Sequence, residues 1–135
     1  NFLLLYFIGG ITGNVVSYLA DIVMCTYGVS AGASTSIFGL FVAIALLGVL
    51  SKKNRAFLSQ YSKGMLSVIG LNIAYTLLMP SVSLSGHLGG ALGGLIGMFM
   101  VPSKSLRVPA AVRAVVSVLW LCSLVYLCFW LGLAG

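Results

Sequence analysis

Charged side chains are scarce in this sequence, and their scarcity excludes most water-soluble folds. Asp, Glu, Lys and Arg make up 6% of the 135 residues, whereas they account for about 25% of a typical soluble domain. Hydrophobic residues make up 61%. The composition therefore indicates a membrane protein. The net charge of +6 does not indicate nucleic-acid binding, because the basic residues lie between apolar stretches, where such charges orient a membrane protein.

Carboxylates and patterned cysteines are scarce as well. Asp21 is the only acidic residue of the chain, and Cys25, Cys122 and Cys128 lack the spacing of a metal site or of a disulfide framework. We therefore expect no metal centre. Because Cys122 and Cys128 lie inside an apolar run, we expect them to be buried packing residues.

The sequence also lacks the features of a signal peptide at its start. The first ten residues, NFLLLYFIGG, contain neither an initiator Met nor a basic region. We expect the chain to begin partway through a larger protein.

Long apolar stretches are abundant. Five of them approach or reach the length of a helix that crosses a hydrocarbon layer of about 30 Å, and short polar breaks separate them. The predicted fold is an all-α membrane bundle with spans at about 2–19, 31–50, 64–79, 85–101 and 112–133.

All basic residues fall in two of the breaks, residues 51–63 and 102–113; they are Lys52, Lys53, Arg55, Lys63, Lys104, Arg107 and Arg113. If the spans alternate in direction, both breaks lie on one side of the membrane, and the excess of positive charge makes that side cytoplasmic. The breaks that contain Asp21 and Ser83 are then external, as is the C-terminus.

Ser34 and His87, the only histidine, lie at similar predicted depths. Ser34 precedes Lys52 by 18 residues and His87 precedes Lys104 by 17, so each lies roughly 26 Å above the cytoplasmic boundary of its helix. Both are therefore expected near the outer ends of inward-running helices, where water can reach them.

Small residues recur at a spacing of four in the two spans that carry Ser34 and His87. This spacing lets helix backbones approach closely in lipid, so helix packing without any chemistry would also explain it. The stripes are Gly28, Gly32 and Ser36 in one span, and Gly86, Gly90 and Gly94 beside Gly89, Gly93 and Gly97 in the other.

His87 favours a catalytic function over packing alone. An ionisable residue inside a membrane span is costly and usually functional, although a hydrogen bond to a neighbouring helix would also explain it. Histidine can take the proton from a serine hydroxyl and later return it to a leaving amine. Because Asp21 is expected in a loop, the sequence favours a Ser34–His87 dyad over a Ser-His-Asp triad.

The segments GASTSIFGL (32–40) and GHLGGALGG (86–94) resemble the rhomboid intramembrane serine proteases. In that family the nucleophile lies in a Gly-x-Ser-Gly motif, and small residues at a spacing of four follow the histidine. Spans one to four here resemble core helices three to six, and span five resembles the seventh helix of some members. The resemblance implies a single, partial rhomboid domain over 1–135.

The resemblance also implies roles for individual residues. Ser34 would attack the scissile carbonyl, its backbone N–H would stabilise the oxyanion, and His87 would be the general base and acid. Phe38 matches an aromatic residue that packs against the histidine. The matching small residues that support the dyad and bring the helices together are Gly32, Gly90 and Gly94. Family substrates are transmembrane segments of other proteins, cut without metal or cofactor, and the short loops suggest a bacterial plasma membrane.

The sequence departs from the family pattern in two ways. Thr35 stands where the family usually has Gly. The upstream helix that supplies further His and Asn oxyanion donors in relatives has no counterpart among these residues.

Two other functions remain open. A rhomboid-like pseudoprotease would bind transmembrane segments without cleaving them, but it would not need both Ser34 and His87. A transporter or channel would need more intramembrane polar residues than the few present, such as Asn14 and Asn72.

Overall fold

Helices form all the regular secondary structure in the part of the chain that the structure describes. The computed structural model describes residues 1–26, 33–50, 55–79, 82–104 and 106–134. Its helices are α1 (Phe2–Met24), α2 (Ser34–Leu50), α3 (Arg55–Leu78), α4 (Leu84–Met100) and α5 (Ala110–Ala134). The predicted all-α bundle is confirmed.

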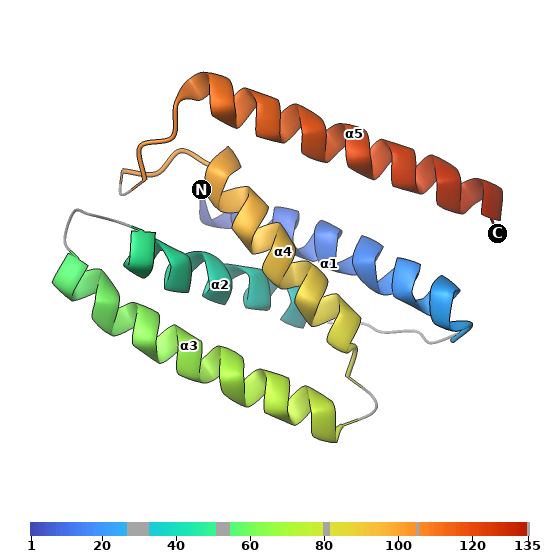
Figure 1. The fold of residues 1–135 in the computed structure, drawn as a ribbon, viewed down its shortest axis with the longest axis horizontal. Helices are drawn as coiled ribbons and strands as arrows, with labels where there is room; N and C mark the ends of the chain where they lie inside the picture. The colour runs from blue at the N-terminus through green and yellow to red at the C-terminus, as the bar shows by residue number, and fades with distance from the viewer. Residues whose placement is uncertain (27–32, 51–54, 80–81, 105, 135) are drawn as a thin grey trace.

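The helices alternate in direction along the bundle (Figure 1). α1, α3 and α5 run one way, and α2 and α4 run the other way. The starts of α3 and α5 therefore lie at the same end as the ends of α2 and α4, so Arg55 and Arg113, in the first turns of α3 and α5, share that end. The starts of α2 and α4, which carry Ser34 and His87, lie together at the opposite end. The assignment of either end to the cytoplasm stays a prediction.

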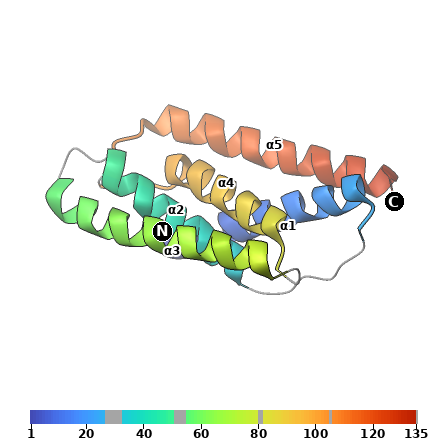
Figure 2. The same cartoon turned by 60° about the horizontal axis from the view of Figure 1, so that its bottom comes forward.

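α1, α2 and α4 form the centre of the bundle, and α3 and α5 lie on opposite sides of this group (Figures 1 and 2). Many of the buried residues of the three central helices are small. A glycine-lined helix can approach its neighbours at the distance of backbone contact. The buried residues of α4 are Gly86, His87, Gly89, Gly90, Gly93, Gly94, Gly97 and Met98.

One glycine stripe of α4 lies against α1. A Cβ added to Gly89 would lie 2.9 Å from the Cα of Gly13, and a Cβ added to Gly93 would lie 2.8 Å from the Cα of Gly9. Real side chains do not approach a backbone that closely, so the two helices are in backbone contact. The contact requires glycine at these positions of α4.

α1 is longer than the sequence predicted. It extends to Met24 instead of about residue 19, so Asp21 lies in its last turn and not in a loop. No proline or glycine interrupts residues 19–24, and helices need not end where the apolar stretch ends. The helix is closed by Cys25, whose backbone is left-handed with φ of 52°. The Asp21 carboxylate accepts a hydrogen bond from the Thr26 hydroxyl (3.2 Å).

α3 begins earlier than predicted, at Arg55 instead of about residue 64. Lys63 therefore lies within a helix and not in a connecting segment, as does Arg113 in α5. The predicted start was placed where the apolar stretch begins, but the helix also includes the polar residues that precede this stretch. The buried Ser62 hydroxyl of α3 donates a hydrogen bond to the carbonyl of Ala45 in α2 (2.7 Å), and this bond links the two helices.

α5 lies at the edge of the bundle. The indole N–H of Trp120 donates to the Thr12 hydroxyl of α1 (3.0 Å). Cys122 and Cys128 are exposed, as is Cys25, so the prediction that Cys122 and Cys128 are buried was wrong. A fully apolar helix gives no periodic signal to distinguish its packed face from its outer face.

Apolar side chains cover the outside of the bundle. Among the described residues, α1 and α5 are long and apolar enough to cross a membrane, and α2 and α4 are apolar but shorter, with 17 residues each. Large side chains such as Phe2, Leu71 and Phe129 are exposed. An apolar surface around a core of small residues is the arrangement expected of helices packed in lipid.

Candidate active site

Ser34 is the first residue of α2, and its side chain is exposed. The carbonyl of Ala33 accepts a hydrogen bond from the amide of Ile37 (3.0 Å). The first helical hydrogen bond of α2 therefore involves the residue immediately before Ser34. The first amides of a helix have no carbonyl partner within it. The backbone N–H of Ser34 is therefore not needed for the helix. Gly28 and Gly32, which the sequence placed on the same helix, lie outside the described residues.

His87 lies in the first turn of α4 and is 5% exposed. Its imidazole stacks on the ring of Phe38, with 5.0 Å between ring centroids and 18° between the planes. Phe38 follows Ser34 by four residues on α2, so the two side chains share a face of that helix. The stack holds the imidazole against the face of α2 that begins with Ser34.

The second glycine stripe of α4 lies against α2. A Cβ at Gly90 would overlap the carbonyl oxygen of Thr35, and a Cβ at Gly94 would overlap that of Gly39. The backbones of the two helices therefore touch from the second residue of α2 onward. This contact sets the distance between the Ser34 turn and the His87 turn.

Thr35 fits beside Ser34 because glycines face its side chain. A Cβ at Gly13 of α1 would lie 2.9 Å from the Cβ of Thr35, and a Cβ at Gly86 of α4 would lie 3.0 Å from its methyl group. The branched side chain fills the space where α1, α2 and α4 meet. Its presence in place of the usual family glycine thus has a local structural explanation.

Serine hydroxyls connect α1 to the start of α4 at the same end of the bundle. The Ser83 hydroxyl caps α4 by accepting the amide of Gly86 (3.0 Å). It also lies 2.8 Å from the Ser17 hydroxyl of α1 and 3.0 Å from that of Ser85. These bonds fix the first turn of α4, in which His87 lies.

Thr76 of α3 is a site residue that the sequence reasoning missed. Its hydroxyl lies 2.9 Å from Nδ1 of His87, and its side chain is 5% exposed. The available signal was a polar residue near the outer end of an apolar stretch, close in sequence to the span that carries the histidine. A single threonine is too common in membrane helices to stand out on that signal alone.

Residues 1–104 match the family profile described as the Rhomboid domain. That match covers most of the chain, including both segments of the site. This chain belongs to the rhomboid family.

Two relatives from Bacillus subtilis (strain 168) extend the comparison. Rhomboid protease GluP is 34% identical over 93 residues, which cover 69% of this rhomboid chain and 17% of GluP. YdcA, named as a candidate rhomboid protease, is 31% identical over 106 residues, which cover 78% of this chain and 51% of YdcA. The chain thus matches only part of the length of either relative. Among solved structures, nothing matches this rhomboid chain significantly.

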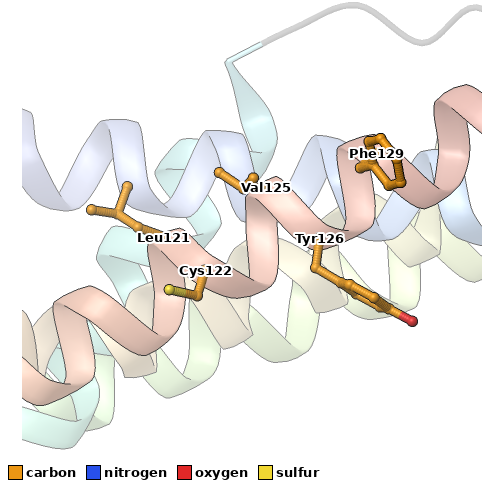
Figure 3. Close-up of a pocket in the computed structure, with 5 residues that line it drawn as sticks. All are labelled: Leu121, Cys122, Val125, Tyr126 and Phe129. Carbon is orange, nitrogen blue, oxygen red and sulfur yellow. The ribbon is translucent and has the colours of Figure 1, made fainter.

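The rhomboid match ends before α5, and a hollow on α5 is separate from the site. Figure 3 shows it lined by Leu121, Cys122, Val125, Tyr126 and Phe129, all from α5. These side chains are exposed, and none is a candidate site residue. The hollow is a feature of the apolar outer surface of the rhomboid bundle.

The described part of the rhomboid chain contains no group of three or more His, Cys, Asp or Glu residues that could hold a metal ion.

Proposed function

We propose that this rhomboid chain carries the catalytic dyad of an intramembrane serine endopeptidase, with Ser34 as nucleophile and His87 as general base and acid. The observation that carries the proposal is the stack of His87 on Phe38, one turn after Ser34 on the same face of α2. Backbone contact at Gly90 supports it, because it leaves no space for a third element between the two turns.

The first step is acylation. His87 takes the proton of the Ser34 hydroxyl while the Ser34 oxygen attacks the carbonyl carbon of the scissile peptide bond. The carbonyl oxygen becomes an oxyanion, for which the backbone N–H of Ser34 is a suitable donor. The protonated imidazole then gives its proton to the leaving amine as the C–N bond breaks.

The second step is hydrolysis of the ester formed on Ser34. His87 takes a proton from water, the hydroxide attacks the ester carbonyl, and the proton returns to the Ser34 oxygen as the C–O bond breaks. The step requires water at the dyad. The exposure of Ser34 and its position at a helix start support such access.

The proposed substrates are transmembrane segments of other membrane proteins. Membership of the rhomboid family supports this class, and the apolar outer surface supports binding within the bilayer. The cut would fall near the level of the α2 and α4 starts, because Ser34 and His87 both lie there.

Mutation of the full-length protein tests the proposal. Since the two residues act as one unit, Ser34→Ala, His87→Ala and the double variant should all reduce cleavage of a transmembrane reporter to a similar residual rate. Ser36→Ala is the matched control, because Ser36 lies in the same turn but is buried against α1. Its cleavage rate should stay close to that of the unmutated protein.

Cleavage that survives Ser34→Ala would contradict the protease proposal. A full-length protein that binds a transmembrane reporter but never cleaves it would instead favour the pseudoprotease. Binding should then be unchanged by Ser34→Ala.

A further inference from the structure

The Thr76 hydroxyl makes two hydrogen bonds with different requirements. It donates to the backbone carbonyl of Asn72, one turn earlier in α3 (2.8 Å). It also lies 2.9 Å from Nδ1 of His87. A hydroxyl has a single proton to donate but two lone pairs with which to accept. Since a carbonyl only accepts, both contacts are hydrogen bonds at the same time only if Thr76 donates its proton to Asn72 and its oxygen accepts from His87.

The direction of this second bond fixes the position of the proton on the imidazole. A neutral histidine carries one N–H, and the other ring nitrogen is an acceptor. If Nδ1–H donates to Thr76, then Nε2 holds the free lone pair. That nitrogen is the one available to take a proton from a serine hydroxyl.

We propose that Thr76 is a positioning residue that holds neutral His87 in the Nδ1–H tautomer and thereby leaves Nε2 as the base for Ser34. The inference rests on the proposed function. In Ser-His-Asp triads a carboxylate fixes the tautomer and orientation of the imidazole. Here a neutral hydroxyl from a neighbouring helix takes the orienting role, and Asp21 is bonded elsewhere, to Thr26.

The stack with Phe38 makes this second restraint necessary. Stacking fixes the plane of the imidazole, but a 180° flip of the ring about its Cβ–Cγ bond preserves that plane and exchanges the two edges of the ring. Only a directional partner distinguishes the two orientations. Thr76 is such a partner, and both side chains are 5% exposed, so water competes poorly for the bond.

The same arrangement occurs elsewhere in the chain with an unambiguous donor. Thr12 of α1 donates to the carbonyl of Ile8, one turn earlier (2.7 Å), and its oxygen accepts the indole N–H of Trp120 (3.0 Å). Indole nitrogen can only donate. A buried threonine that is bonded back to its own helix therefore accepts an aromatic N–H in this fold, as the direction assigned to Thr76 requires.

The test compares Thr76→Val, Thr76→Ser and Thr12→Val in the full-length protein. Valine keeps the shape of threonine without its hydroxyl, so Thr76→Val should lower kcat about tenfold or more, by analogy with triads whose histidine has the wrong tautomer. KM should change little, because no substrate contact is lost. Thr76→Ser should restore most of the rate. Thr12→Val removes an equivalent hydroxyl outside the site and should leave kcat unchanged.

Nitrogen-15 NMR of labelled histidine provides a readout that a purely structural role would not change. The His87 signal, identified by its loss in His87→Gln, should report Nδ1–H in the unmutated protein and in Thr76→Ser. In Thr76→Val it should shift towards the Nε2–H form. If Thr76→Val does not fold, Thr76→Ala carries the same two predictions.

Normal kcat in Thr76→Val, or an unchanged tautomer, would overturn the role of Thr76. That failure is distinguishable from failure of the proposed function. If Ser34→Ala abolishes cleavage while Thr76→Val does not, the dyad stands without Thr76. If Ser34→Ala still cleaves, the dyad itself is wrong.

Discussion

α4 and α5 are both apolar helices, but they are held in the bundle by different means. α4 packs through glycines whose backbones touch α1 and α2. In the part of α5 that could span a membrane, no residue is buried. Its hydrogen bond to α1 is made by a side chain, the indole of Trp120, which donates to Thr12. α4, which carries His87, is thus fixed by backbone contacts that leave no space for an added side chain. α5, which lies beyond the matched Rhomboid domain, is attached through side chains, which can change conformation.

Of the substitutions that test this difference between α4 and α5, Gly94→Ala should have the largest effect on stability and cleavage. The added Cβ would overlap the Gly39 carbonyl oxygen, and neither backbone can move without disturbing the other contacts of α4. We expect the free energy of unfolding in detergent to fall by about 2 to 3 kcal/mol, with loss of cleavage. Unfolding curves in increasing SDS measure the change.

Gly70→Ala in α3 is the matched control for Gly94→Ala. A Cβ at Gly70 meets no atom within 4 Å, so the same substitution should change the free energy of unfolding by less than about 1 kcal/mol, in the stabilising direction that helix propensity favours. Equal losses from both substitutions would mean that glycine content, and not backbone contact, distinguishes α4.

Trp120→Phe should have a smaller effect, confined to α5. It removes the hydrogen bond to Thr12 but keeps most of the aromatic surface, and we expect a loss of about 1 kcal/mol in the free energy of unfolding. The rate of reporter cleavage should not change, because no side chain that the structure describes on α5 belongs to the candidate site. A strong loss of cleavage with an intact fold would show that α5 acts on the site.

Thr35→Gly should have the smallest effect, although Thr35 is adjacent to Ser34. It restores the usual family residue and removes a side chain that fills space between Gly13 and Gly86. The free energy of unfolding should fall by about 1 kcal/mol or less, and reporter cleavage should be kept or raised. A loss of cleavage greater than about tenfold would show that Thr35 has a role beyond filling this space.

The helical class and the order of the spans could be predicted because they depend on composition and on the length of apolar stretches. The proximity of the Ser34 and His87 turns follows from alternating direction and glycine spacing, both of which the sequence displays. The cytoplasmic side of residues 51–63 and 102–113 is also a sequence prediction, and labelling of introduced cysteines would test it.

Helix ends and individual partners were harder to predict. Asp21 and Lys63 lie within helices because backbone hydrogen bonds continue beyond the apolar stretch. Thr76 was missed because its partner comes from another helix, and no local pattern encodes which face of α3 meets α4. Cys122 and Cys128 were misplaced because α5 is apolar on its packed and outer faces alike.

Of the proposals made for this rhomboid chain, the activation of Ser34 as a nucleophile by His87 is the one on which the others depend. The most direct measurement is covalent labelling of the full-length protein in detergent by a fluorophosphonate probe, with the modified residue located by mass spectrometry. We expect a label on Ser34 that is absent in Ser34→Ala, much slower in His87→Ala and undiminished in Ser36→Ala. Labelling of Ser34 at an undiminished rate in His87→Ala, or labelling of another serine in place of Ser34, would contradict this proposal.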